Sequence, residues 1–290
     1  MIFKDFSKTY ELLDPFENVS STISALNDSA EIISNFDHFK DGWLLLSSGE
    51  YLEYLNPFTK ETGKYPPCEV TFTRFGLSTC PTSSDCLTVG MFGYKNMATI
   101  GWFDAAVGEW EYYDAENSDT DIQFVPTLKI GPKYHNNAFY SLARDGCLGE
   151  LKFAEGEISW KVYKHPFYEE TSSLNSSYLV EVDGELVSVF IGGHGSWVNV
   201  FKFNISDKCW IKLDTLGEHT LFVSPASSFS IKTDKSEMRN RIYLPRRKEN
   251  KIVFHSRDTG KYHTSTSANS LDDFYGTKAQ SFCCWVYISL

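Results

Sequence analysis

The sequence predicts an all-β protein that is assembled from a repeated antiparallel unit, and three observations lead to this prediction. Aromatic residues make up 16% of the 290-residue chain, and aromatic side chains fit the pleated, half-buried surface of a sheet. Large aromatic residues recur about every fifty positions. Turn residues such as Gly and Asp separate short apolar segments, whereas helical periodicity is scarce apart from residues 20–39, which are compatible with one short helix.

The repeat is clearest at five aromatic residues, each of which opens a strand directly after a turn. Three of them lie in the segments GWFDAAVGEWEYYD, LKFAEGEISWKVYK and FKFNISDKCWIKLD, in which a Phe stands seven residues before the Trp. The five residues are Tyr65, Trp110, Trp160, Trp210 and Tyr262, so successive copies are 45, 50, 50 and 52 residues apart. A repeat of this length with three or four antiparallel strands is the signature of a propeller blade. We expect these aromatics to pack between neighbouring blades, because one blade cannot cover both of its faces.

We therefore predict a kelch-like β-propeller of six blades that occupies residues 1–290 as a single domain. The repeated aromatics account for five blades. The N-terminal segment TYELLDPFEN and the C-terminal segment AQSFCCWVYISL have the character of strands. Their pairing in a sixth blade would close the ring and remove free sheet edges. Seven blades are the alternative, if the region Cys68–Leu87 supplies a blade of its own.

The charge and the cysteine content limit the partners and the compartment. The net charge of −11 repels phosphate backbones and anionic lipids, so we expect neither nucleic acid nor a membrane as partner. The basic cluster within residues 239–248 is expected to be a solvated loop. Seven scattered cysteines, with no secretion signal or apolar run long enough to span a bilayer, predict a reduced compartment, the cytoplasm or the nucleus.

Six motifs in a fixed order resemble one protein family. They are DGWLLLS at 41–47, LNPFTKETGKYPP at 55–67, VEVDGELVSVF ending at Phe190, LGEHTLFVSPASSFSI at 216–231, NRIYLPR at 240–246 and FHSRDTGKYHT at 254–264. The closing segment CCWVYISL also fits. The chain thus resembles, from about residue 10 to the end, the plant F-box/kelch-repeat proteins with a KIB-type β-propeller.

The resemblance implies a propeller that recognises a protein without catalysing a reaction. In that family the propeller commonly follows an F-box, which binds the Skp adaptor of a cullin ubiquitin ligase, so the propeller presents a substrate for ubiquitination. Residues 1–40 show no Leu- and Pro-rich helical F-box, so we expect this segment not to bind Skp. The alternative is an enzyme or a carbohydrate-binding propeller with a site in its central channel.

No motif in the sequence predicts a catalytic residue, a cofactor or a metal. The glycine-rich IGGHGSW at 191–197 lacks the lysine and the following helix of a phosphate loop, so a hairpin is predicted there. In SRDTGKY, Asp258 and Gly260 are explained as turn residues rather than as part of a sialidase Asp-box. The cysteine pairs Cys80 with Cys86 and Cys283 with Cys284 do not have the spacing of a zinc knuckle.

The predicted recognition surface consists of loops that join strands, because loops on a rigid scaffold carry function. The four loops lie at 94–96, 134–137, 194–197 and 246–250. Their candidate protein-binding residues are Tyr94, Tyr134, His194, Trp197, Arg246 and Arg247. Trp197 lies outside the fifty-residue register, so it is either an exposed hot spot or a residue that packs under its own loop.

Overall fold

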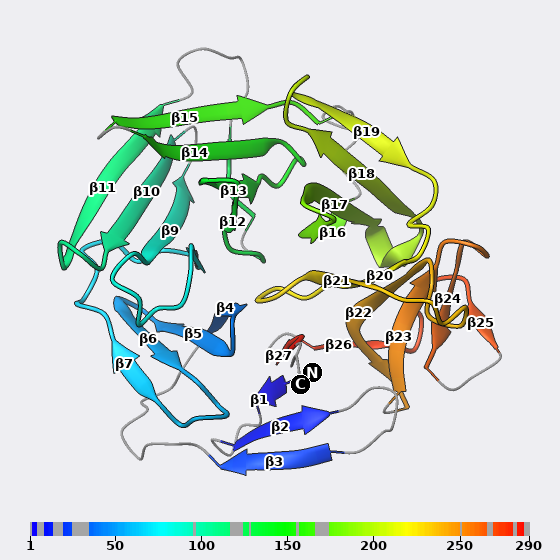
Figure 1. Cartoon of the computed structure of the whole chain (residues 1–290). Helices are drawn as coiled ribbons and strands as arrows, with labels where there is room; N and C mark the ends of the chain where they lie inside the picture. Colours follow the sequence, from blue (N-terminus) through cyan, green and yellow to red (C-terminus); the bar gives the residue numbers. More distant parts are fainter. Residues whose placement is uncertain are drawn as a thin grey trace. The chain divides into compact units, whose positions relative to one another are not determined.

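The computed structural model describes residues 2–4, 9–13, 20–24, 35–94, 97–116, 124–127, 129–154, 157–165, 174–249, 251–265, 269–280 and 283–286. These residues form an all-β structure in which six sheets are described (Figure 1). The chain divides into two compact units. One is Ser29–Thr171, and the other combines Met1–Asp28 with Ser172–Leu290. No helix in the described ranges is long and apolar enough to cross a bilayer.

The unit Ser29–Thr171 contains three four-stranded antiparallel sheets, and in each of them the strands pair in sequence order. The first sheet consists of β4 (Asn35–Lys40), β5 (Trp43–Ser48), β6 (Tyr51–Leu55) and β7 (Thr62–Lys64). The second consists of β8 (Arg74–Leu77), β9 (Leu87–Tyr94), β10 (Met97–Asp104) and β11 (Glu109–Glu116). The third consists of β12 (Lys133–His135), β13 (Ala138–Leu142), β14 (Leu148–Ala154) and β15 (Glu157–Tyr163).

The other unit contains two four-stranded sheets and one larger sheet. The first has β16 (Leu174–Val182), β17 (Glu185–Gly192), β18 (Val198–Asn204) and β19 (Cys209–Leu213), with the short 3₁₀ turn η2 (Gly193–Gly195) between β17 and β18. The larger sheet has β20 (His219–Phe222), β21 (Phe229–Lys232), β22 (Arg241–Lys248), β23 (Lys251–Ser256), β24 (Lys261–Thr264), β25 (Ser270–Leu271) and β26 (Lys278–Ala279). Within it β20 runs parallel to β22.

The last sheet joins the two ends of the chain. It consists of β27 (Cys283–Cys284), β1 (Ile2–Lys4), β2 (Thr9–Leu13) and β3 (Ser20–Ser24), paired in that order. Ile2 lies opposite Cys284 in the antiparallel register of β1 and β27. The predicted meeting of the N-terminal and C-terminal segments in one sheet is therefore confirmed, although β1 lies between β27 and β2, the strand of the segment TYELLDPFEN. Trp285 anchors this end in its own unit, because its indole is 2% exposed and its Nε1 donates to the Val223 carbonyl at 2.9 Å.

The strands also bear on two possibilities that the sequence left open. The two ends of the stretch 20–39, which was compatible with one short helix, belong to β3 and β4, while residues 25–34 lie outside the described residues. The region Cys68–Leu87 does not form a sheet of its own. It supplies the first strand, β8, to the sheet of β9, β10 and β11.

Turn chemistry explains why the strands return where they do. Three two-residue hairpins have positive φ at both central residues, the geometry that matches the twist of the flanking strands. They are Asp41–Gly42, Asn136–Asn137 and Asp183–Gly184. The outer hairpins use a side-chain acceptor instead. The Asp104 carboxylate accepts from the Ala106 N–H at 2.8 Å, and the Asn204 amide oxygen accepts from the Ser206 N–H at 3.0 Å.

The repeated tryptophans lie on the last strand of three sheets, as the period predicts. Trp110 and Trp210 face the Phe that stands seven residues earlier, at ring distances of 5.5 and 5.0 Å from Phe103 and Phe203. The middle copy differs because its hairpin is shorter. Two residues lie between the paired ends Ala154 and Glu157, whereas four lie between Asp104 and Glu109 in the copy before it. Trp160 therefore lies opposite Leu151, and its ring is 4.9 Å from that of Phe124.

Candidate functional site

The loop that joins β17 to β18 is held in one conformation by glycines and by its own tryptophan. The Gly192 N–H donates to the Trp197 carbonyl at 2.9 Å, which closes the hairpin predicted for this segment. The half-buried Trp197 indole lies against Gly192, where a Cβ would come within 2.3 Å of its Nε1. His194 is exposed and adopts φ 54°. Trp197 thus packs under its own loop, whereas His194 presents its side chain to solvent.

Arg246 lies beneath this loop region, and Phe274 connects the two. The Phe274 N–H donates to the His194 carbonyl at 2.9 Å, and its ring packs against Gly195. The Arg246 guanidinium lies 4.0 Å from the centre of the Phe274 ring. Two predicted loop segments that are about fifty residues apart in sequence therefore meet at a third segment, which the sequence analysis did not single out.

Arg246 is held by directed hydrogen bonds as well as by stacking. Its Nε donates to Thr277 Oγ1 at 2.8 Å, and its Nη2 lies 3.3 Å from the Thr277 carbonyl oxygen. Burial lowers the pKa of the Arg246 guanidinium from its usual value, but arginine remains charged in proteins. The result is a half-buried cation in a defined orientation.

Phe274 and its neighbour Tyr275 were not among the binding residues predicted from the sequence. Tyr275 is 87% exposed, the largest exposure among the exposed large hydrophobic residues in the described part of the chain. The signal was present in the sequence: two adjacent aromatics stand in the polar, turn-like stretch DDFYGT. An aromatic residue in a turn without strand alternation has no sheet face to occupy, so one of the pair is expected at the surface.

The other predicted binding residues, Tyr134, Arg247 and Tyr94, lie on strands. Tyr134 is half-buried on β12, where its hydroxyl donates to Asn137 Oδ1 at 3.2 Å and its ring is 5.0 Å from that of Phe139. The basic cluster was predicted to be a solvated loop, and Arg246 and Arg247 to lie in a binding loop, and both predictions were wrong. Residues Arg241–Lys248 form the strand β22, on which Arg246 and Arg247 are half-buried and pair with Ala279 and Lys278 of β26. Tyr94 ends β9, but its side chain and residues 95, 96 and 250 lie outside the described residues. Nothing in the structure assigns a ligand to these positions, and they remain predictions.

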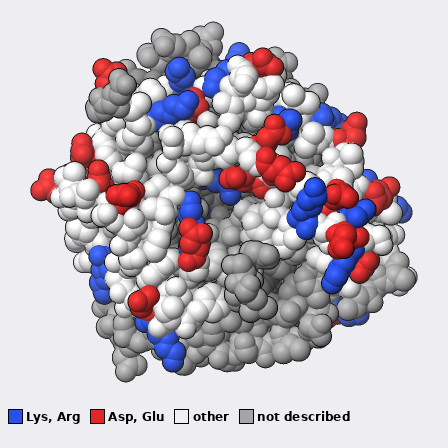
Figure 2. Space-filling view, in the orientation of Figure 1, with Lys and Arg blue, Asp and Glu red and all other residues white. Residues whose placement is uncertain are grey.

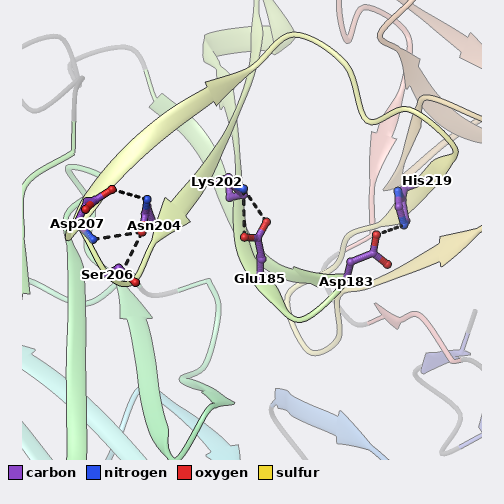
Figure 3. A network of polar contacts seen from close by, with 7 residues as sticks. All are labelled: Asp183, Glu185, Lys202, Asn204, Ser206, Asp207 and His219. Atoms are coloured by element: carbon purple, nitrogen blue, oxygen red, sulfur yellow. Dashed lines mark hydrogen bonds and ion pairs between the residues drawn. The ribbon is translucent and has the colours of Figure 1, made fainter.

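Polar contacts brace the turns at one end of the sheet β16–β19 (Figure 3). Lys202 on β18 bridges to Glu185 on β17 at 2.8 Å. The Asn204 amide donates to Asp207 within the next hairpin at 2.7 Å. Asp183 lies 3.1 Å from Nε2 of His219, at the start of β20. These contacts involve exposed or half-buried side chains, and we interpret them as supports of the turns rather than as a reactive centre.

Two buried carboxylates in the unit Ser29–Thr171 are likewise explained by structure. Glu150 accepts from the hydroxyls of Tyr140 and Tyr163 at 2.7 and 2.6 Å. Burial opposes its charged form, but these hydrogen bonds and Lys152 outweigh that effect and lower the pKa of Glu150. Asp37 is fully buried, 3.5 Å from the Arg74 guanidinium, and burial raises its pKa to about 6. A carboxyl group at this depth is out of reach of a substrate.

The Asp-box and zinc alternatives find no support at the residues concerned. Asp258 lies in the turn 257–260, and its carboxylate accepts a hydrogen bond from the Asn240 amide at 2.6 Å. None of the described cysteines, Cys283 and Cys284 included, is part of a disulfide. No group of three or more potential metal ligands occurs among the residues that the structure describes.

Charged side chains of both signs are interspersed over the face that Figure 2 presents. The described part of this face thus carries no extended field of one sign, which is what a surface that attracts a polyanion would require.

Comparison with known proteins gives a consistent assignment. Residues 17–263 match the KIB1-4 beta-propeller family. An F-box/kelch-repeat protein of Arabidopsis thaliana is 27% identical over 279 residues, which cover 91% of this chain and 75% of that protein. Two F-box proteins of the same plant are 25% identical over 279 residues and 24% identical over 258 residues. These alignments cover 91% and 83% of this chain, and 69% and 50% of the respective relatives.

The family match includes all strands from β4 to β23, and it confirms the resemblance that the six motifs indicated. The four-stranded antiparallel sheets are what the blades of such a protein require. The chain is therefore a member of the KIB1-4 β-propeller family.

Proposed function

We propose that this chain is a non-enzymatic recognition domain that binds a protein through loops at one rim of a propeller. The observation that carries the proposal is the meeting of the His194 loop with Arg246 through Phe274. Loops that are locked onto a sheet scaffold lose little conformational entropy on binding, which favours recognition. The relatives named as F-box proteins support a role in presenting the bound protein to a ubiquitin ligase when an F-box accompanies the propeller.

We further infer that the six described sheets are six blades of a single propeller domain. In this proposal the pairing of β1 with β27 closes the ring. The position of β8 in the sheet of β9–β11 supports six blades rather than seven, because the region Cys68–Leu87 then has no separate blade to contribute.

Site-specific photo-crosslinking tests the recognition function. A photo-reactive amino acid is placed at His194, which is exposed on the loop, and for comparison at Ile211, which is 42% exposed on β19. In cells that produce the full chain, the His194 position should crosslink to a defined protein that the Ile211 position does not capture. That protein, once purified, should bind the wild-type chain directly. Equal crosslinking at both positions, or no direct binding, would contradict the proposal.

A further inference from the structure

The segment Asp272–Thr277, which we call the aromatic turn, holds an exposed tyrosine on a defined backbone. Tyr275 is 87% exposed. Its N–H donates to Asp273 Oδ1 at 2.7 Å, and the Thr277 N–H donates to the Phe274 carbonyl at 3.0 Å. Exposure of a large aromatic side chain to water is unfavourable, and here the exposed ring stands on a turn that its own hydrogen bonds hold.

Phe274 packs the aromatic turn against other residues of its unit. Its side chain is 8% exposed and lies 5.0 Å from the ring of Tyr262. It also contacts Gly195, where an added Cβ would come within 2.8 Å of the ring. Phe274 thereby holds the backbone of the turn in place, while Tyr275 beside it remains exposed.

Arg246 lies at the base of the aromatic turn without a carboxylate partner. No ion pair joins it to an acidic residue in the described part of the chain, and its hydrogen bonds go to Thr277 alone. A half-buried charge without a counter-ion is costly to maintain. Close to it, the buried hydroxyl of Tyr262 finds no hydrogen-bond partner among the described residues. The half-buried Arg246 guanidinium is suited to an anionic ligand, whereas the Tyr262 side chain is only 1% exposed.

A second cation, Lys248, lies two residues after Arg246 on β22, so both side chains project to the same face of the sheet. The Lys248 ammonium is 3.8 Å from the place that a Cβ on Gly276 would occupy, and no described acidic residue pairs with it. The two acids of the turn do not neutralise these cations. Asp272 bridges to Lys261 at 3.1 Å, and Asp273 accepts from the Tyr275 N–H. In a chain with a net charge of −11, the turn thus lies beside two cations that have no described acidic partner.

We propose that the aromatic turn, together with Arg246 and Lys248, binds a partner segment in which a carboxylate side chain lies next to an apolar one. The carboxylate contacts the Arg246 guanidinium, which presents directed donors, and Lys248 adds its charge. The apolar side chain packs against Tyr275, a residue type enriched in binding hot spots. This inference rests on the proposed recognition function, and it names the chemistry of the partner.

A peptide-display selection on the purified full chain tests the inference. Acidic residues next to an apolar residue should be enriched in the selected peptides. The affinity of a selected peptide, measured by fluorescence anisotropy, should fall about tenfold when its Glu is replaced by Gln. Tyr275→Ala should also weaken binding by about tenfold, because truncation of a tyrosine hot spot has effects of this size. Ile211→Ala, at another exposed apolar side chain of the same unit, should leave the affinity unchanged.

The contribution of the cations is separated from an effect on folding by a double-mutant cycle. Lys248→Gln and Arg246→Lys are combined with the Glu→Gln peptide, and the peptide change should cost less on the variants than on the wild type. The inference is overturned if the selected peptides lack acidic residues, if only phosphorylated peptides bind, or if Tyr275→Ala binds normally. Peptides that bind away from the aromatic turn contradict the inference about the partner but not the proposed recognition function. An absence of peptide binding together with failed His194 crosslinking contradicts both proposals.

Discussion

Acidification from pH 7 to pH 5 should destabilise the fold through His255, and His255→Gln should remove this part of the loss. His255 lies on β23, is 4% exposed, and its ring is 5.0 Å from that of Tyr262. Burial, and then the charge of Arg257, lower the pKa of His255 to about 4 from the usual 6.5. The folded state therefore binds the proton less readily than the unfolded state does.

The sign and the size follow from proton linkage. For a histidine whose pKa is lowered on folding, the stability is fully present above the unfolded-state pKa and is lost as the pH falls towards the folded-state value. With a pKa of about 4 in the folded state and 6.5 in the unfolded state, the loss between pH 7 and pH 5 is about 2 kcal/mol. Asp37 acts in the opposite direction, because its raised pKa favours the fold at lower pH. The comparison must therefore be made between variants rather than on the wild type alone.

Urea unfolding followed by tryptophan fluorescence at pH 7 and pH 5 gives the measurement. The quantity of interest is the change in the free energy of unfolding between the two pH values, so any constant cost of the substitution cancels. His194→Gln, at an exposed position, is the matched control and should lose as much stability as the wild type. If His255→Gln also loses as much as the wild type, the burial argument is refuted.

Three further substitutions test the packing. Trp210→Ala should lower the free energy of unfolding by about 3–5 kcal/mol, because the Trp210 side chain is 8% exposed and packs on Phe203; thermal unfolding that shifts by only a degree or two would contradict this. Gly149→Val should destabilise more than Gly108→Val, as chemical denaturation can measure, because a Cβ at Gly149 would lie 2.2 Å from the Trp160 ring whereas nothing lies within 4 Å of one at Gly108, although valine is strained there by the positive φ. Arg257→Met should cost about 3 kcal/mol, because it strands three carbonyl groups of Val198, Leu213 and Asp214 that the guanidinium now contacts at 2.9–3.2 Å; an unchanged urea midpoint would argue against that role.

The repeat, most of the turns and the meeting of the chain ends in one sheet could be predicted from the amino-acid pattern alone. A spacing of about fifty residues placed Trp110, Trp160 and Trp210 on the last strand of their sheets. Alternation and turn residues are local properties of the backbone, so they can be recognised without knowledge of distant contacts. The exception is Phe153, which faces Ile158 rather than Trp160, because a hairpin two residues shorter shifts the register.

Which segments lie together at the candidate site became visible only in the folded chain. His194 and Arg246 were separate candidates, and it is Phe274, 80 residues after His194, that connects them. The sequence left open whether Trp197 was exposed. In the structure the Trp197 indole packs against Gly192, and the exposed aromatic side chain is that of Tyr275. A residue's exposure depends on what distant segments place over it. No local pattern contains that information, which is why the repeat was predictable and the candidate recognition surface was not.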